Sequence, residues 1–131
     1  MGKIQKVLIV EDNVTLNESL VFLIERLGVE ALQAYDALEA LEIIRGNEID
    51  AVISDVTMPG MSGLELLREI KRFKQELPVI IMSGRPGTGL AHKAMQDGAL
   101  GFLAKPIDDK MLSAILRIAL EISKRAQVAS Q

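Results

Sequence analysis

The stretch Ala51–Gly63, AVISDVTMPGMSG, decides the fold of this 131-residue chain. An apolar run ends there in a carboxylate, Asp55, and a turn rich in glycine and proline follows at once. A short apolar run bounded by turn signals is typical of a buried strand, so we predict that Asp55 lies at the tip of one. The other segments of the chain indicate what the carboxylate does there.

Short apolar runs alternate with amphipathic helical patterns along the chain. The predicted strands are Lys6–Val10, Glu30–Ala34, Asp50–Ser54, Val79–Met82 and Leu100–Ala104. A helical pattern follows each strand, and the expected N-caps are Asp36, Ser62 (in a capping box with Glu65) and Asp108. Three of the strands are nearly continuous aliphatic runs, as in a parallel sheet covered on both faces. We therefore predict an α/β fold, a doubly wound five-stranded parallel sheet with five helices.

The C-terminal region is expected to end in a polar tail. The predicted inner face of the last helix consists of Leu112, Ile115, Leu116, Ala119 and Ile122. The following segment SKRAQVASQ, residues 123–131, is polar and is expected to fray or to serve as a linker. We assign residues 1–126 to one domain and residues 127–131 to a tail or the start of a linker.

Composition excludes several function classes. The chain has no cysteine, which excludes thiolate catalysis, thiolate metal sites and disulfides, and this fits a cytoplasmic location. Its single histidine, His92, is expected to be solvated and cannot form a multi-histidine metal site. The net charge is −3, so charge gives no argument for nucleic-acid binding by this domain. No stretch approaches the roughly 18 apolar residues of a membrane span.

Residues with chemically useful side chains follow four of the predicted strands. Glu11 and Asp12 follow the first strand, Asp55 the third, Ser83 the fourth and Lys105 the fifth. The carboxyl ends of parallel strands meet at one edge of the sheet, where such folds bind ligands. Three carboxylates there repel one another, and Mg²⁺ relieves that repulsion with hard oxygen ligands. One carboxylate can then attack phosphorus, while the lysine and the hydroxyl neutralise developing charge.

Each of these residues also has an ordinary structural interpretation. Glu11 and Asp12 could form a solvated turn, or Asp12 could cap a helix. Asp55 could cap a loop, Ser83 could be a turn serine, and Lys105 could be a surface lysine. The agreement of all of them at one edge favours the site over these separate explanations.

The sequence resembles the receiver domain of bacterial two-component response regulators, from about Lys6 to Ile122. The resemblance rests on the motifs VEDN, SDVTMPGMSG, IIMSG and GALGFLAKP, which occur in that order and at the expected strands. It implies the strand order 2-1-3-4-5 and a cis bond between Lys105 and Pro106.

The resemblance implies a phosphoryl acceptor and a metal site. Asp55 would accept the phosphoryl group from a sensor histidine kinase or a histidine phosphotransferase. Mg²⁺, with Mn²⁺ as an alternative, would be held by Asp55, by Asp12 directly, by Glu11 through a water molecule, and by the backbone carbonyl of Thr57.

The resemblance also implies a conformational switch. Lys105 would pair with Asp55 before phosphorylation, and Ser83 and Lys105 would then contact the phosphoryl group. The glycine-rich loop Gly84–Gly89 would move with Ser83 because its backbone is permissive. Phe102 stands where the family commonly has tyrosine, so it lacks the hydroxyl that a partner could contact, and its coupling to output is open.

The same resemblance implies partners and a tuned lifetime. Thr57 and Arg85 would flank the path of an attacking water and set the dephosphorylation rate. The surface of helix 4, strand 5 and helix 5 would change and be read by an output domain, a target protein or a second copy of the chain.

Alternative functions remain open at this point. The leading hypothesis is a regulatory binding module that catalyses its own phosphorylation and dephosphorylation. A degenerate receiver that binds a partner without phosphate is an alternative. An aspartate-nucleophile phosphatase of the haloacid dehalogenase type would carry DxDxT on the first strand, whereas Asp55–Thr57 gives only DVT on the third. A flavin carrier is weaker still, because the chain has only three phenylalanines and one tyrosine.

Overall fold

The computed structural model describes residues 3–85, 87 and 89–129. The strands are β1 (Lys6–Val10), β2 (Glu30–Ala34), β3 (Ala51–Asp55), β4 (Val79–Ser83) and β5 (Gly101–Ala104). The helices are α1 (Val14–Glu25), α2 (Ala37–Gly46), α3 (Gly63–Phe73), α4 (Leu90–Gln96) and α5 (Asp109–Ala129). The predicted strands are therefore present, with shifts of one residue at some ends. Within the described residues, no helix is both long enough and apolar enough to cross a membrane.

All five strands run parallel in the order β2-β1-β3-β4-β5, which confirms the predicted doubly wound sheet. The chain leaves β1 toward β2 on one side and then returns past β1 to β3 on the other. The order therefore reverses between β1 and β3, and a crevice for ligands is expected outside the carboxyl ends of these two strands.

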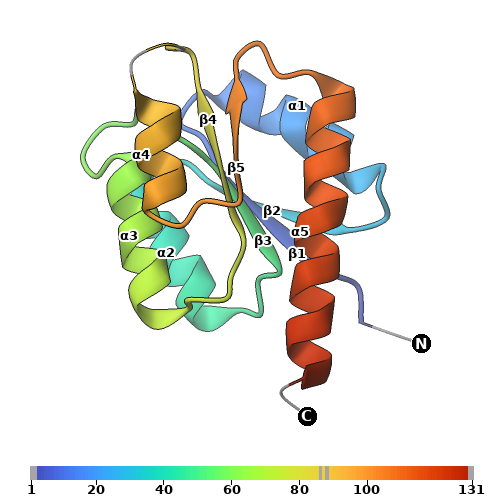
Figure 1. The fold of residues 1–131 in the computed structure, drawn as a ribbon. Coiled ribbons are helices and arrows are strands. Elements are labelled where there is room, and N and C mark those ends of the chain that lie inside the picture. The colour runs from blue at the N-terminus through green and yellow to red at the C-terminus, as the bar shows by residue number, and fades with distance from the viewer. Residues whose placement is uncertain (1–2, 86, 88, 130–131) are drawn as a thin grey trace.

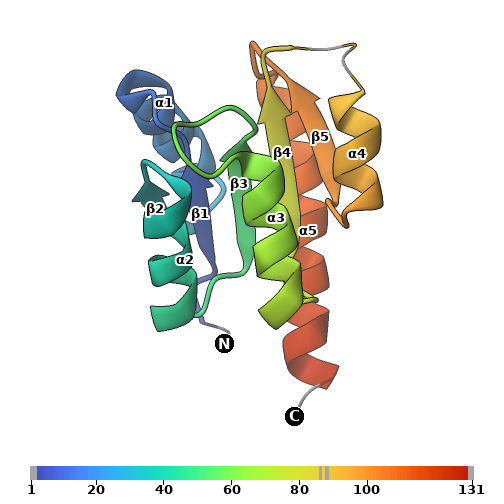
Figure 2. The ribbon, with the colours of Figure 1, turned by 90° about the vertical axis from the view of Figure 1, so that its left-hand side faces the viewer.

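Helices cover both faces of the sheet (Figures 1 and 2). The helices α2, α3 and α4 pack on one face, and α1 and α5 pack on the other. Alternate strand side chains enter the two cores, as in β1, where Leu8 and Val10 contact the first and Val7 and Ile9 the second. Because both faces are buried, the central strands have to be aliphatic throughout, which explains their sequence.

Capping residues mark the starts of the helices, including α1, which follows the loop with Glu11 and Asp12. The predicted N-caps are confirmed for Asp36, Ser62 and Asp108, and the capping box between Ser62 and Glu65 is present. The cap of α1 is Asn13, whose Oδ1 accepts a hydrogen bond from the Leu16 backbone N–H at 2.9 Å. Asp12 therefore does not cap this helix, which excludes one of its two structural interpretations.

The expectation that the polar C-terminal segment frays is wrong for residues 123–129, because α5 continues to Ala129. Ser123 is buried, and its hydroxyl donates to Asp50 Oδ1 at 2.8 Å. Gln127 Nε2 donates to the same oxygen at 2.9 Å. Ile122, placed on the inner face by its spacing, is 40% exposed. The polar segment is thus a helix that anchors a buried carboxylate, and the expected boundary after residue 126 falls inside it; residues 130 and 131 lie outside the described residues.

Replacing Asp50 by alanine is expected to destabilise the fold by about 3 kcal/mol. Asp50 is 4% exposed, and it also accepts the Lys6 backbone N–H at 2.8 Å through Oδ2. Its loss leaves the Lys6 amide and the Ser123 hydroxyl without their acceptor. Urea-induced unfolding gives the change in the free energy of unfolding.

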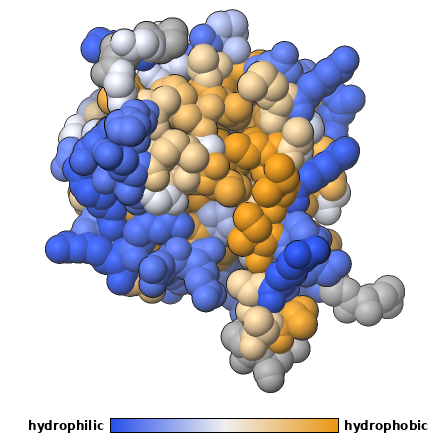
Figure 3. All heavy atoms as spheres, viewed as in Figure 1, coloured by the Kyte–Doolittle hydropathy of each residue, from blue (hydrophilic) through white to orange (hydrophobic). Residues whose placement is uncertain are grey.

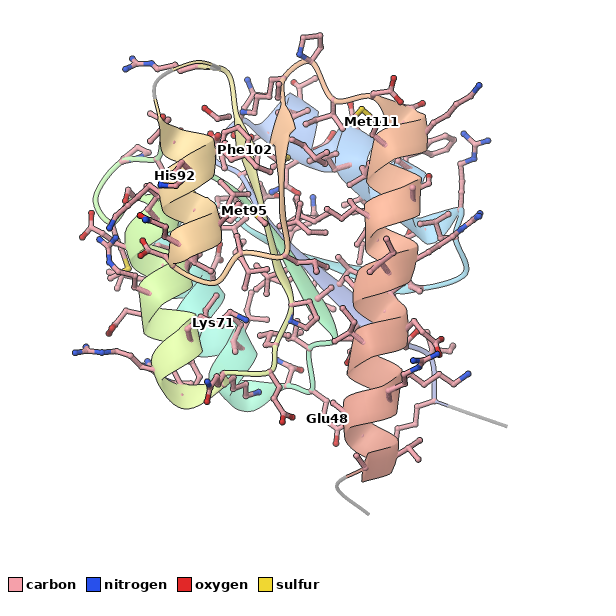
Figure 4. The ribbon with its side chains drawn as sticks, viewed as in Figure 1. Glu48, Lys71, His92, Met95, Phe102 and Met111 are labelled. Carbon is pink, nitrogen blue, oxygen red and sulfur yellow. The ribbon has the colours of Figure 1, made fainter. Side chains whose placement is uncertain are left out.

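Glu48→Ala is the matched control for Asp50→Ala. Glu48 lies two positions before Asp50 in the chain (Figure 4), but it is exposed and makes a surface ion pair with Lys3 at 3.4 Å. Such pairs contribute about 0–1 kcal/mol. Equal stability of the two variants would contradict the anchoring role of Asp50.

Candidate functional site

The carboxyl edge of the sheet gathers the residues that the sequence singled out. Asp55 is the last residue of β3 and Ser83 the last of β4. Glu11 directly follows β1, and Lys105 directly follows β5. Backbone pairing continues beyond the strand ends, since the Lys105 N–H donates to the Ser83 carbonyl oxygen at 2.8 Å. The sheet itself therefore fixes the positions of these four residues.

Three carboxylates converge between β1 and β3. One oxygen from each of Glu11, Asp12 and Asp55 lies within 4.8 Å of the others. Glu11 is 1% and Asp55 6% exposed, while Asp12 is open to solvent. Hard carboxylate oxygens at this spacing, open on one side, suit a divalent cation that keeps part of its water shell, so these residues fit Mg²⁺.

Lys105 neutralises part of this negative charge. Its Nζ lies 2.8 Å from Glu11 Oε1 and 3.3 Å from Asp55 Oδ2. The sequence paired Lys105 with Asp55 alone, so the shorter contact with Glu11 is a new finding. No local sequence signal could have indicated it, because 94 positions separate Lys105 from Glu11.

At both Glu11 and Lys105, burial and the neighbouring charges shift the pKa in opposite directions. Burial raises the pKa of the Glu11 carboxyl above its ordinary value, while its hydrogen bonds with Lys105 and with the Asn13 backbone N–H oppose that rise. Burial lowers the pKa of Lys105, but the hydrogen bond to Glu11 and the charge of Asp55 outweigh it, and the net pKa is raised. The lysine therefore stays cationic, and it stabilises the carboxylate forms beside it.

The other predicted site residues lie around the cluster. Ser83 is buried, and its Oγ accepts the Arg85 backbone N–H at 3.0 Å. Thr57 and Arg85 are exposed in the loops that follow β3 and β4. Phe102 in β5 is half-buried and packs against the core that α2, α3 and α4 cover. The structure thus brings Glu11, Asp12, Asp55 and Lys105 together, with Ser83 at the same edge of the sheet.

A glycine that the sequence patterns did not single out supports the Asp55 backbone. Gly63 begins α3, and its N–H donates to the Val56 carbonyl oxygen at 2.8 Å. A Cβ atom added at Gly63 would overlap the Asp55 carbonyl oxygen and lie 2.9 Å from Val56 Cα. Only glycine lets the start of α3 lie this close to the Asp55 backbone. In the sequence, the glycine of the MSG motif was the feature that could have indicated this close contact.

Gly63→Ala is expected to lower the free energy of unfolding by about 3 kcal/mol, because backbone atoms have to move to admit the methyl group. Urea unfolding measures this loss. Gly46→Ala is the control, since Gly46 lies at the end of α2 with open space around it. Alanine at position 46 is expected to raise the free energy of unfolding by about 0.5–1 kcal/mol through its higher helix propensity. A stabilising or neutral Gly63→Ala would contradict the close approach.

The parallel sheet with an acidic cluster and a lysine at its carboxyl edge defines a doubly wound α/β protein with a candidate cation site. The family model described as response regulator receiver domain matches residues 7–117. The chain therefore belongs to the response regulator receiver domain family, which acts in two-component signalling.

Curated relatives agree with this assignment. The chain is 35% identical over 118 residues to the transcriptional regulatory protein FixJ of Bradyrhizobium diazoefficiens, covering 90% of this chain and 58% of that protein. It is 36% identical over 117 residues to the sensor kinase CckA of Brucella abortus, covering 88% of this chain and 12% of that protein. The chain spans little more than half of FixJ, so the activity of the whole relatives does not transfer to it.

Solved structures support the fold. A response regulator receiver domain protein from Clostridium thermocellum is 36% identical, with a TM-score of 0.88, and the match covers 94% of this chain and 99% of that one. NtrX from Brucella abortus, solved in complex with ATP, is 32% identical with a TM-score of 0.88, and the match covers 98% of this chain and 29% of that one.

Proposed function

We propose that this chain is a phosphorylation-dependent switch that accepts a phosphoryl group on Asp55. The observation that carries the proposal is the placement of the Asp55 carboxylate. It ends β3 within the acidic cluster, and Lys105 Nζ lies 3.3 Å from its Oδ2. A nucleophilic carboxylate beside a fixed cationic side chain is the arrangement that phosphoryl transfer to aspartate needs.

The transfer forms and breaks one bond to phosphorus. An Oδ atom of Asp55 donates an electron pair to phosphorus, and the bond from phosphorus to the donor breaks. The leaving group, a histidine nitrogen or the acetate of acetyl phosphate, keeps the electron pair of that bond. In dephosphorylation the oxygen of a water molecule bonds to phosphorus and the bond from phosphorus to Asp55 Oδ breaks. The carboxylate keeps the electron pair of that bond and is restored, and the protons of the water leave with inorganic phosphate or pass to solvent. The module thus catalyses its own phosphorylation and dephosphorylation.

The residues present fit a divalent cation, and we propose that Asp12, Asp55 and the Thr57 carbonyl bind Mg²⁺ while Glu11 acts through a water molecule. Mg²⁺ would neutralise charge on the transferring phosphoryl oxygens. Mn²⁺ would serve as a substitute. Lys105 would neutralise further charge on the phosphoryl group, and its Nζ is held by Glu11 Oε1 at 2.8 Å.

We propose that Ser83 and Phe102 couple this site to a surface. The buried Ser83 hydroxyl sits at the end of β4 and would donate a hydrogen bond to a phosphoryl oxygen, while its Oγ accepts the Arg85 backbone N–H. The expected motion of the loop Gly84–Gly89 stays a prediction, because residues 86 and 88 lie outside the described residues. The proposed lifetime-tuning roles of Thr57 and Arg85 likewise stay predictions.

The output surface is proposed to lie over α4, β5 and α5. Apolar side chains gather on this face (Figure 3), and Met95, Phe102 and Met111 lie on it (Figure 4). Met95 is 50% and Met111 59% exposed, and Ile118 on α5 is 55% exposed. Such a patch suits an output domain, a target protein or a second copy of this chain. His92 on α4 is exposed nearby.

The wider context is also a proposal. The phosphodonor would be a sensor histidine kinase or a histidine phosphotransferase, and the location would be cytoplasmic. FixJ is named a transcriptional regulatory protein and CckA a sensor kinase, so receiver domains of this kind accompany different partner domains. The intact carboxylate cluster argues against a degenerate receiver, and no feature of the site favours a phosphatase or a flavin carrier.

Incubation with Mg²⁺ and acetyl phosphate tests the proposal. Intact-mass spectrometry is expected to detect a single phosphoryl adduct that appears with Mg²⁺ and is absent when a chelator removes the metal. Absence of the adduct together with no binding of beryllofluoride, a mimic of the trapped phosphoryl group, would overturn the proposal.

A further inference from the structure

A fully buried asparagine on α1 is the most unusual polar residue outside the carboxylate cluster. Asn17 has no exposed surface, whereas the other buried residues of α1 are Leu20 and Ile24. A buried amide costs free energy unless it is hydrogen-bonded, and an apolar residue fills such a position more simply. The hydrogen bonds of Asn17 therefore indicate its role.

Asn17 fastens the end of β1 to the end of β2. Its Nδ2 donates to the Glu11 carbonyl oxygen at 3.0 Å and to the Ala34 carbonyl oxygen at 3.2 Å. Its Oδ1 accepts from Gln33 Nε2 at 3.0 Å. The Glu11 N–H also donates to the Ala34 carbonyl oxygen at 3.1 Å, so Asn17 closes a small cycle of contacts around Glu11.

Two further hydrogen bonds connect Asn17 with the loop that carries the carboxylates. The Asn17 backbone N–H donates to the Asn13 carbonyl oxygen at 2.9 Å, and the Asn13 N–H donates to Glu11 Oε2 at 3.1 Å. Asp12 lies between Glu11 and Asn13 and has both of its chain neighbours tied to Asn17. The exposed Asp12 carboxylate thus projects from a backbone that the Asn17 side chain holds at Glu11 and that the first backbone hydrogen bond of α1 holds at Asn13.

We propose that Asn17 is a positioning residue that pre-organises Glu11 and Asp12 for the divalent cation. This inference rests on the proposed function, because it concerns the cation site of the same switch. A loop already held in its binding conformation loses less conformational freedom when the ion binds. Residues that orient metal ligands typically affect metal affinity by 10–100-fold.

The variant Asn17→Leu keeps the size of the side chain and removes both donors. It is expected to weaken Mg²⁺ binding by about tenfold. Asn17→Ser is the milder variant, because its hydroxyl can still donate to one of the two carbonyls. It is expected to retain part of the affinity, and it keeps the inference testable if the leucine variant does not fold.

Cation binding is measured directly, without phosphorylation. Electron paramagnetic resonance counts free Mn²⁺ during a titration of the metal-free protein, and competition with Mg²⁺ gives the Mg²⁺ affinity. Ile24→Val and Ile24→Ala are the controls. Ile24 is buried on the same helix and packs in the core beneath α5, away from the carboxylates. These two variants lower stability to different extents and are expected to bind the cation like the parent.

The outcomes separate the inference from the proposed function. Failure of the parent protein to bind Mn²⁺ or Mg²⁺ would overturn the proposed function, and this inference with it. Normal binding by the parent and equal binding by both Asn17 variants would overturn the inference alone. An Ile24 variant of the same stability that loses as much Mn²⁺ affinity as the Asn17 variants would also overturn the inference alone. Weaker binding confined to the Asn17 variants supports the positioning role.

Discussion

Asp55→Asn is expected to abolish the phosphoryl adduct formed with Mg²⁺ and acetyl phosphate. The amide has no charged oxygen to attack phosphorus, and the change also removes one of the three carboxylates that would hold the cation. The remaining residues keep their positions, because the Asp55 backbone is held by its pairing with β4 and by Gly63. Intact mass followed over time measures the loss.

Asp36→Asn is the charge-matched control for Asp55→Asn. Asp36 caps α2, and asparagine caps a helix about as well as aspartate. This variant loses the same charge outside the site and is expected to form the adduct at the parental rate. An undiminished adduct in Asp55→Asn would assign the acceptor to another residue and would contradict the proposed chemistry.

Lys105→Met is expected to slow adduct formation by about 100-fold, the usual cost of removing one group that stabilises developing negative charge. The metal and acceptor residues remain, so the reaction is expected to persist at this lower rate. The same change is expected to cost about 2 kcal/mol of stability near neutral pH, since Glu11 keeps a buried charge without its partner. The partial exposure of Lys105, 23%, keeps this loss below that of a fully buried pair.

The pH dependence of Lys105→Met follows from the raised pKa of Glu11. Its ordinary value is 4.5, and burial raises the folded-state value. Between the two values the folded protein binds more protons than the unfolded chain, so stability falls as pH rises through this window. Removing the Lys105 hydrogen bond raises the folded-state pKa further. Urea unfolding across a pH series is therefore expected to give a steeper fall for the variant, and Mg²⁺ is expected to restore stability.

Lys3→Met is the control for Lys105→Met. Lys3 makes an exposed ion pair with Glu48, so its loss is expected to change neither stability nor adduct formation appreciably. Equal rates and equal pH profiles for the parent and Lys105→Met would show that the lysine contributes nothing to either property.

The strands were predictable because they depend on local pattern, and their order was implied by the resemblance to receiver domains. Short aliphatic runs bounded by turn signals, such as Val79–Met82, favour a doubly buried strand, and capping residues such as Ser62 mark helix starts. The C-terminal helix was not predictable in the same way. Its last turns are polar, and they are held by the buried carboxylate of Asp50, which lies 73 positions from Ser123.

The candidate site was predictable as a set of residues but not as a set of contacts. Because parallel strands end at one edge of the sheet, the order of strands and motifs is enough to place Asp55 and Lys105 together. The same rule does not predict which carboxylate is nearer to Lys105 Nζ, which lies closer to Glu11 than to Asp55. Side-chain reach and burial decide that choice, and both depend on the packed neighbours.

The amino-acid sequence is thus sufficient for the strands, for three of the helix caps and for the residues at the carboxyl edge, because periodicity, capping chemistry and motif order are properties of neighbouring positions. The strand order followed from the resemblance to receiver domains. Three features required the assembled fold: Asn17 ties Glu11 to Ala34, Gly63 leaves room for the Asp55 backbone, and the last helix continues to Ala129. The physical reason is that hydrogen bonding and close packing join atoms from distant segments, whose separations exist only once the sheet and both helical layers have come together.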